Sequence, residues 1–356
     1  MVTISSLAGE TKNPYNTFHV PAGSSGGTAA AVASNFGSVG LGTDTGNSIR
    51  GPSSHNALVG FRTTLGLVSR AGIVPLYLRN DVGGPMCRTV EDATRILDII
   101  AGYDPDDELT HMSEGKIPES YMDFLDKDGL KGKRIGVLSD LTEKDIHPEI
   151  QKLFYQAIED LRRLGAEVID NVYIDNFDTL SSGHWAPAFQ YDLNKYLSEQ
   201  EADVPVKNLQ EVFDAGNYSS YIEDNLKYHL RFKNNPEERF PPILGAYKDP
   251  ERIKYRKAIE DKMNELELDA FIYPSWNFPP ARIGHFEEYL GDNNQIVAPH
   301  TGQPAFTIPM GYLSGDLPCG LQFLGRSFDE ATLIKLSYSY EQGTRHRKEP
   351  AILSSN

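Results

Sequence analysis

Two serines stand in glycine-rich turns of this 356-residue chain. Ser24 belongs to the run Gly-Ser-Ser-Gly-Gly-Thr at residues 23–28, and Ser48 belongs to Gly-Thr-Asp-Thr-Gly-Asn-Ser-Ile-Arg at residues 42–50. Glycine adopts positive φ freely and leaves room beside the backbone. A serine in such a turn can present its hydroxyl while neighbouring N–H groups point toward a developing oxyanion. The pattern therefore predicts a serine hydrolase that has a nucleophile and an oxyanion hole.

The glycine run at residues 23–28 has three other interpretations. A linker is the commonest role of such a run, but this one leads directly into small residues at 28–34, which predict a tightly packed helix. A Walker-type phosphate loop needs a Lys-Ser/Thr pair after the glycines, and none follows here. A dinucleotide-binding fingerprint needs a preceding strand, and residues 19–22 form a poor one.

The chain from Ser5 to about Gly102 resembles the amidase signature family. The resemblance rests on segments that occur in the family's order, at residues 12–16, 23–34, 42–54, 59–73 and 81–90. A weaker match returns at residues 268–274, 302–309 and 317–323. The middle, from about Pro105 to Glu265, matches in outline only.

The resemblance implies a Ser–cis-Ser–Lys amidohydrolase in which Ser48 is the nucleophile. It also implies that Ser24 follows a cis peptide bond and bridges Ser48 to a lysine. A serine hydroxyl is a weak nucleophile until a base takes its proton. A buried lysine can be that base, because burial lowers its pKa. We therefore expect the Ser24 hydroxyl to lie within hydrogen-bond reach of Ser48.

The resemblance places the oxyanion hole in the backbone N–H groups of Thr45, Gly46, Asn47 and Ser48. Asn47 stands where the family commonly has glycine. Asparagine tolerates left-handed φ better than other residues with side chains, so the turn can form. Its side chain could also narrow the pocket.

Three further residues are expected to support the turn without touching substrate. Ser25 is predicted to donate a hydrogen bond behind the catalytic serines. Asp44 and Arg50 are predicted to form an ion pair that braces the turn.

The family's catalytic lysine lies several dozen residues upstream of the first serine. Only Lys12 precedes Ser24 here, and it is expected to be a solvated loop residue. We therefore interpret the chain as an N-terminally shortened member of the family. The face that the missing helices would cover is expected to be exposed, which predicts self-association into a homo-oligomer.

A Ser-His-Asp mechanism is the rival within enzymes. The α/β-hydrolase elbow has the pattern G-x-S-x-G, whereas the sequence around Ser48 lacks the final glycine. No sequence feature pairs His55 or His300 with Ser48.

Composition narrows the class of protein further. The formal net charge of −16 argues against nucleic acid or an anionic membrane as a partner. No apolar run has the length of a membrane span, and the first residues lack the features of a signal peptide. Two cysteines fit a reducing compartment, so we expect a cytoplasmic protein. No His/Cys cluster suggests a metal, and no cofactor is expected.

The expected fold class is α/β, with a large mixed, mostly parallel β-sheet flanked by helices. Residues 133–138 and 166–169 read as strands on either side of a helix at 147–164, which predicts a right-handed crossover. Residues 330–340 are expected to form an amphipathic surface helix. Residues 275–280 are expected to form either a loop that walls the pocket or a packed proline-rich turn. The chain is taken as one domain, residues 1–356. It divides into a catalytic core at 1–105, a variable, mostly helical substrate-side part at 106–265, and a return to the sheet at 266–356.

These observations favour hydrolysis of a small-molecule amide, a non-protein C–N bond, through an acyl-enzyme on Ser48. The family also includes subunits that pass ammonia to a transamidation partner, so an amidotransferase A-type subunit is one alternative. A non-catalytic pseudoenzyme or binding protein is another, because the lysine is absent.

Overall fold

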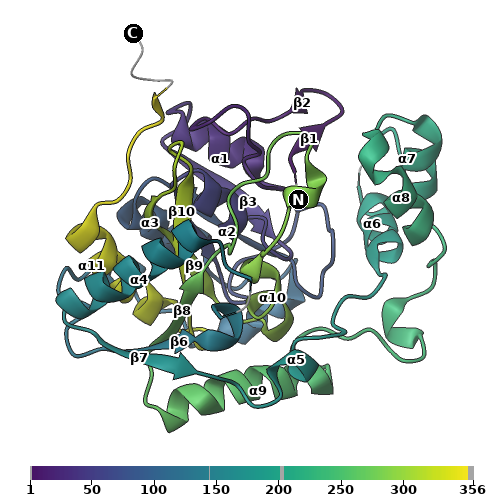
Figure 1. Cartoon of the computed structure of the whole chain (residues 1–356). Coiled ribbons are helices and arrows are strands. Elements are labelled where there is room, and N and C mark those ends of the chain that lie inside the picture. Colours follow the sequence, from purple (N-terminus) through teal and green to yellow (C-terminus); the bar gives the residue numbers. More distant parts are fainter. Residues whose placement is uncertain (1, 144, 201–203, 352–356) are drawn as a thin grey trace.

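The computed structural model describes residues 2–143, 145–200 and 204–351. Their centre is a mixed sheet with the strand order β3-β5-β4-β9-β10-β8-β6-β7 (Figure 1). The strands, in that order, are Val39–Asp44, Val82–Cys87, Val59–Arg62, Ala305–Tyr312, Pro318–Leu324, Ala270–Pro274, Arg134–Leu138 and Glu167–Val172. A short hairpin, β1 (Ile4–Ser5) and β2 (Gly9–Glu10), lies outside this sheet.

The prediction of a mixed sheet flanked by helices is confirmed, but the prediction that most of it is parallel is wrong. Five of the seven neighbouring pairs in the described sheet are antiparallel, and only β6–β7 and β6–β8 are parallel. The β6–β7 pair comes from the one segment that has a strand–helix–strand pattern. Elsewhere β9 and β10 follow each other through a short turn, and such a turn can join only antiparallel strands.

The strand–helix–strand prediction is confirmed. Helix α4 (Pro148–Arg163) connects β6 to β7, and those strands pair in parallel. Ile150, Phe154 and Leu161 on its predicted apolar face are buried, and Gly165 follows the helix with a φ of +98°.

Helices cover both faces of the sheet, because alternate residues of each strand point to opposite faces. In β8, Ala270 and Ile272 belong to the apolar cluster that contains residues of α3 (Val90–Ile100), α4 and α11 (Glu330–Thr344). Phe271 and Tyr273 belong to the opposite cluster. That cluster contains residues of α5 (Phe177–Leu180), α9 (Pro250–Glu265) and α10 (Ala298–Thr301).

Helix α11 corrects a second expectation. The prediction of an amphipathic surface helix is wrong, because none of its residues between Glu330 and Tyr340 is exposed. The helix packs on the sheet and also contacts α3 and α4, so it is covered on several sides.

The segment at residues 106–265 supplies two strands of the sheet, β6 and β7, and a helical arm. The arm consists of α6 (Phe189–Ser198), α7 (Leu209–Ala215) and α8 (Glu223–His229), which lie to one side of the sheet in Figure 1. Leu193, Leu209 and Leu226 bury their side chains in a separate apolar cluster there. A buried ion pair between Arg79 and Asp192, at 2.5 Å, ties the arm to the core.

The candidate catalytic turns adjoin the end of the sheet that is formed by β3. Helix α1 (Gly26–Ala33) follows the Ser24 turn, and α2 (Arg50–His55) follows the Ser48 turn. Ala29 of α1 and Ile49 before α2 share one buried apolar cluster. Among the described residues, no helix is both long enough and apolar enough to cross a bilayer.

The buried carboxyl of Glu330 predicts how stability depends on pH. Burial raises its pKa to about 7 from an ordinary value of 4.5, so the folded state holds this proton more tightly than the unfolded chain. The contribution of Glu330 to stability is therefore lost as pH rises from about 4.5 to about 7. The variant Glu330→Gln keeps an acceptor for the Thr64 N–H, which donates to Glu330 Oε1 at 2.6 Å. At pH 8 we expect the free energy of unfolding of this variant to exceed that of wild type by about 1–3 kcal/mol, and at pH 4.5 we expect the two to be equal. Urea denaturation at both pH values measures the difference. An equal gain at both pH values would contradict this explanation.

Candidate active site

The turn between β3 and α2 is closed by the carboxylate of Asp44, the last residue of β3. Asp44 Oδ2 accepts from the N–H groups of Ile49 and Arg50 at 3.2 and 3.3 Å, and from Arg50 Nε at 3.0 Å. Arg50 Nη2 donates to the Gly46 carbonyl at 2.7 Å. The predicted Asp44–Arg50 ion pair is present, and both side chains are fully buried.

A second arginine, Arg62 of β4, completes this network. Its Nη1 lies 2.8 Å from Asp44 Oδ1, and its Nη2 donates to the Asn80 carbonyl at 2.8 Å. Sequence reasoning missed Arg62, because it lies 18 residues from Asp44 and meets it only through the sheet.

The network is charged at neutral pH. Burial alone would raise the pKa of the Asp44 carboxyl, but the charges of Arg50 and Arg62 lower it to about 2. Burial lowers the pKa of Arg62 to about 10. Asp44 and Arg62 therefore keep their charges in the physiological range.

Ser48 lies in the enclosed part of this turn and is 1% exposed. Its Oγ lies 3.5 Å from Asn47 Oδ1, and its carbonyl accepts from the Ser25 N–H at 3.3 Å. Across the described part of the chain, the N–H groups of Thr45, Gly46 and Asn47 donate to no acceptor. Asn47 does not adopt positive φ, so the left-handed conformation expected for it is not needed. Its Nδ2 instead donates to Asp292 Oδ2 at 2.6 Å.

The Ser24 turn matches one expectation and contradicts another. The Gly23–Ser24 peptide bond is cis, as predicted. Ser24 is exposed, and no hydrogen bond between described residues joins its hydroxyl to Ser48. The expected contact is therefore wrong. The two turns meet instead through the backbone of Ser25, whose N–H donates to the Ser48 carbonyl.

Ser25 supports the turn from the side of β3. Its Oγ donates to the Thr43 carbonyl and accepts from the Thr43 N–H, both at 3.3 Å. This is the supporting contact expected of it, although it reaches the strand rather than Ser48. Lys12 is exposed, as expected for a loop residue.

Two side chains from distant segments wall the turn at Gly46. A Cβ added at Gly46 would lie 3.3 Å from Trp185 Cζ2 and 3.3 Å from Gln295 Cγ. Trp185 is 48% exposed, and its ring packs against Tyr77 and His300 with centroids 5.5 and 5.3 Å apart. Sequence reasoning missed Trp185 and Gln295, since neither segment carries a local motif.

In the segment at residues 275–280, Trp276 is buried and packs over the start of α2, so the expected pocket wall stays a prediction. A Cβ at Gly51 would lie 2.9 Å from Trp276 Cζ3. The ring also lies 4.7 Å from that of His55.

Burial lowers the pKa of His55 to about 3 and also lowers that of His300, so both rings are neutral at pH 7. Among the described residues, neither ring is hydrogen-bonded to Ser48, which does not favour a Ser-His mechanism.

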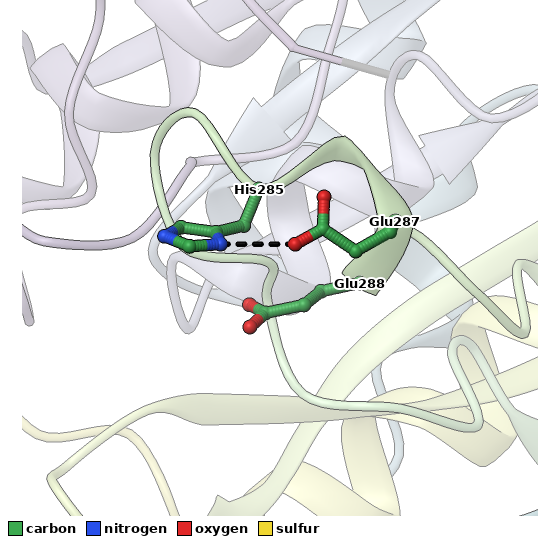
Figure 2. Close-up of side chains that lie close together, drawn as sticks. All are labelled: His285, Glu287 and Glu288. Carbon is green, nitrogen blue, oxygen red and sulfur yellow. Dashed lines mark hydrogen bonds and ion pairs between the residues drawn. The ribbon is translucent and has the colours of Figure 1, made fainter.

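One exposed cluster among the described residues has the side chains of a metal site. His285, Glu287 and Glu288 lie close together in Figure 2. His285 Nδ1 lies 2.9 Å from Glu287 Oε1, and Arg282 pairs with Glu288. The hydrogen bonds from Arg282 lower the pKa of Glu288 to about 2. A cation there would compete with an ion pair already formed, so we assign no metal to this cluster.

The network around Asp44 yields a stability prediction. Asp44→Asn leaves two buried arginines without their counter-charge, and breaking a buried pair in this way costs about 3–5 kcal/mol. We expect the urea midpoint of Asp44→Asn to fall accordingly at pH 7. The exposed pair Arg95–Glu91 offers a matched control, because Glu91→Gln should cost no more than about 0.5 kcal/mol. Equal midpoints for the two variants would refute a supporting role of Asp44.

Comparisons with known proteins show which family the chain belongs to. The family model described as Amidase matches residues 1–334. The chain is 35% identical to a probable amidase of Arabidopsis thaliana over 96% of its own length and 64% of that protein's. It is 33% identical to the A-type subunit of the glutamyl-tRNA(Gln) amidotransferase of Oceanobacillus iheyensis, covering 95% of this chain and 70% of the relative.

Solved structures of similar fold include proteins of the same kinds. The peptide amidase from Stenotrophomonas maltophilia superposes with a TM-score of 0.82 at 32% identity, over 98% of this chain and 71% of that one. The A-type subunit of the glutamyl-tRNA(Gln) amidotransferase from Thermotoga maritima superposes with a TM-score of 0.71 at 27% identity, over 96% and 70%. The chain spans less than two thirds of the Arabidopsis relative's length. It belongs to the amidase family.

Proposed function

We propose that this chain hydrolyses carboxylic amides through an acyl-enzyme formed on Ser48. The proposal rests on the N–H groups of Thr45, Gly46 and Asn47, which have no acceptor among the described residues and border a buried serine hydroxyl. Donors arranged in advance at the position of a developing negative charge make the largest single contribution to catalysis in many enzymes. The Asp44–Arg50–Arg62 network holds these donors in place before substrate arrives.

The proposed reaction has two steps. Ser48 Oγ attacks the amide carbonyl carbon, and the carbonyl oxygen takes up negative charge beside the N–H groups of residues 45–47. The C–N bond then breaks, the amine or ammonia leaves with a proton, and an ester to Ser48 remains. Water hydrolyses that ester and frees the carboxylic acid.

We propose that Ser24 passes the Ser48 proton toward a base once substrate is bound, because catalytic hydrogen bonds that are absent from a free enzyme often form only in the substrate complex. The N–H of the adjoining residue, Ser25, donates to the Ser48 carbonyl, and this hydrogen bond holds the two turns next to each other. Small-molecule amides are the proposed substrate class. The half-exposed ring of Trp185 beside Gly46 favours those with a flat or apolar acyl group.

An amidotransferase A-type subunit is the second candidate, supported by the relatives of that name in Oceanobacillus iheyensis and Thermotoga maritima. Release of ammonia from glutamine, compared with cleavage of an anilide, distinguishes the two. A pseudoenzyme would do neither and would leave Ser48 unreactive.

We further propose a cytoplasmic protein that self-associates along the edge strand β3. Cys87 and Cys319 are buried free thiols, which fits a reducing compartment. Leu41 is 55% exposed, and it lies opposite Pro85, which has no N–H. The N–H and C=O of Leu41 therefore face the free edge of the sheet, where a second chain could pair.

Light scattering tests this association. We expect wild type to give a mass above that of a monomer and Leu41→Lys to give a monomer, because a charged side chain on an edge strand opposes pairing. The exposed Leu7→Lys variant serves as a control outside the sheet, with no change expected. A monomeric wild type at micromolar concentration would contradict the proposal.

Labelling by an alkyl fluorophosphonate tests the nucleophile. We expect mass spectrometry to place the adduct on Ser48 and Ser48→Ala to abolish it. Ser24→Ala should slow labelling by about 10²–10⁴-fold, because a proton-transfer partner is lost. The exposed Ser38→Ala should label at the wild-type rate.

The same variants are then assayed on a p-nitrophenyl ester and an anilide. Loss of both activities in Ser48→Ala is the expected result. An adduct on another serine, or turnover that survives Ser48→Ala, would overturn the proposed function.

A further inference from the structure

We propose that Asp81 is a positioning residue that fixes the N–H of Thr45 relative to the aromatic wall formed by Trp185. The inference rests on the proposed function and deepens it. It names the side chain that keeps the proposed oxyanion donors and the proposed acyl-group wall at a constant separation. Asp81 is buried and directly precedes β5.

One carboxylate oxygen of Asp81 holds the start of the oxyanion turn. Thr45 directly follows β3, and the antiparallel pairing of Asp44 with Val82 brings Thr45 opposite Asp81. The Thr45 hydroxyl donates to Asp81 Oδ1 at 2.5 Å, and both residues are buried. A β-branched side chain has few χ1 rotamers. Fixing the Thr45 hydroxyl therefore also fixes the backbone that carries its N–H.

The other oxygen of Asp81 holds a different segment. Asp81 Oδ2 accepts from the N–H groups of Leu76 and Tyr77 at 2.9 and 2.8 Å. Both oxygens of a carboxylate are acceptors, so one side chain can hold two segments at once. Asp81 therefore joins the oxyanion turn to the segment that contains Tyr77.

The segment that contains Tyr77 supports the aromatic wall. The ring of Tyr77 packs against that of Trp185, with centroids 5.5 Å apart. Trp185 in turn lies beside Gly46, the residue after Thr45. The contacts thus form a closed ring that starts at Thr45 and returns to its neighbour, and Asp81 is the charged member of that ring.

This closed ring predicts two separate effects of removing Asp81. A displaced N–H of Thr45 would stabilise the oxyanion less well, which lowers the rate of attack by Ser48. A displaced ring of Trp185 would change which acyl groups fit beside the turn. Loss of Asp81 should therefore alter both the rate and the selectivity.

Labelling of Ser48 by two fluorophosphonates, one with a methyl and one with a phenyl group on phosphorus, measures both effects. The phosphonyl oxygen takes the place of the oxyanion, and the group on phosphorus takes the place of the acyl group. The maximal labelling rate reports the oxyanion donors. The ratio of the phenyl rate to the methyl rate reports the wall, because the intrinsic reactivity of each reagent is the same for every variant.

We expect Asp81→Ala to lower both maximal rates at least about tenfold and to change their ratio at least about threefold. Thr45→Val, which removes the hydroxyl alone, should lower both rates by the same factor and leave the ratio unchanged. Tyr77→Leu should change the ratio and alter the methyl rate by less than about twofold.

Asp104→Ala is the matched control. Asp104 also accepts from a hydroxyl, that of Ser69 at 2.5 Å, and from a backbone N–H, that of Asp106 at 3.0 Å. Among the described residues, none of its hydrogen bonds reaches residues 44–50 or 76–77. Its rates and its ratio should equal those of wild type.

Wild-type rates and a wild-type ratio in Asp81→Ala would overturn the inference, even with a lower melting temperature, because Asp81 would then support only the fold. A change in the rates alone or in the ratio alone would overturn it too. So would wild-type rates in Thr45→Val or a wild-type ratio in Tyr77→Leu. Circular dichroism melts show which variants fold, and these last two decide if Asp81→Ala does not. The proposed function fails separately, if Ser48→Ala still labels.

Discussion

The structure around Ser48 depends on one buried carboxylate with two guanidinium partners. Asp44 ends β3 and caps the first N–H groups of the following helix, while Arg50 and Arg62 neutralise it from that helix and from β4. A buried charge is tolerated only when it is paired and hydrogen-bonded. The pairing therefore specifies how the turn runs between two elements of the sheet. As a consequence of that path, the N–H groups of residues 45–47 find no acceptor within the described parts of the chain.

This arrangement separates the residues that support the turn from those that line its mouth. The supporting residues are fully buried and charged, and they lie within or directly beside the sheet. The lining residues lie far along the chain: Trp185 and Asp292 are in loops, and Gln295 is in the short 3₁₀ helix Asn293–Gln295. Members of one family can keep the first set and vary the second, which gives one chemistry several substrate classes.

Local features could be predicted from the sequence, whereas contacts that depend on strand pairing in the sheet could not. The turn residues Asp44 and Arg50, the helix after the Ser24 turn and the parallel pair around α4 were predictable, because each depends on neighbours within a few dozen residues. Arg62 and Asp292 were not, since no local motif marks either residue. Arg62 meets Asp44 only through the pairing of the sheet, and Asp292 lies 245 residues from Asn47. The mostly parallel sheet was also wrong. The parallel pairing expected for one strand–helix–strand segment was assumed for the other strands too, but their pairing is seen only in the three-dimensional structure. Ser24 shows the limit of a motif, since its cis bond was predicted correctly and its contact was not.

If the turn works as an oxyanion hole, its N–H groups must bind a negative oxygen on a group attached to Ser48. A crystal structure of the chain after reaction with an alkyl fluorophosphonate would show whether they do. We expect phosphorus bonded to Ser48 Oγ, and the phosphonyl oxygen about 2.7–3.1 Å from at least two of the N–H nitrogens of Thr45, Gly46 and Asn47. A phosphonyl oxygen directed to solvent, with those N–H groups bonded elsewhere, would show that the turn does not stabilise the oxyanion.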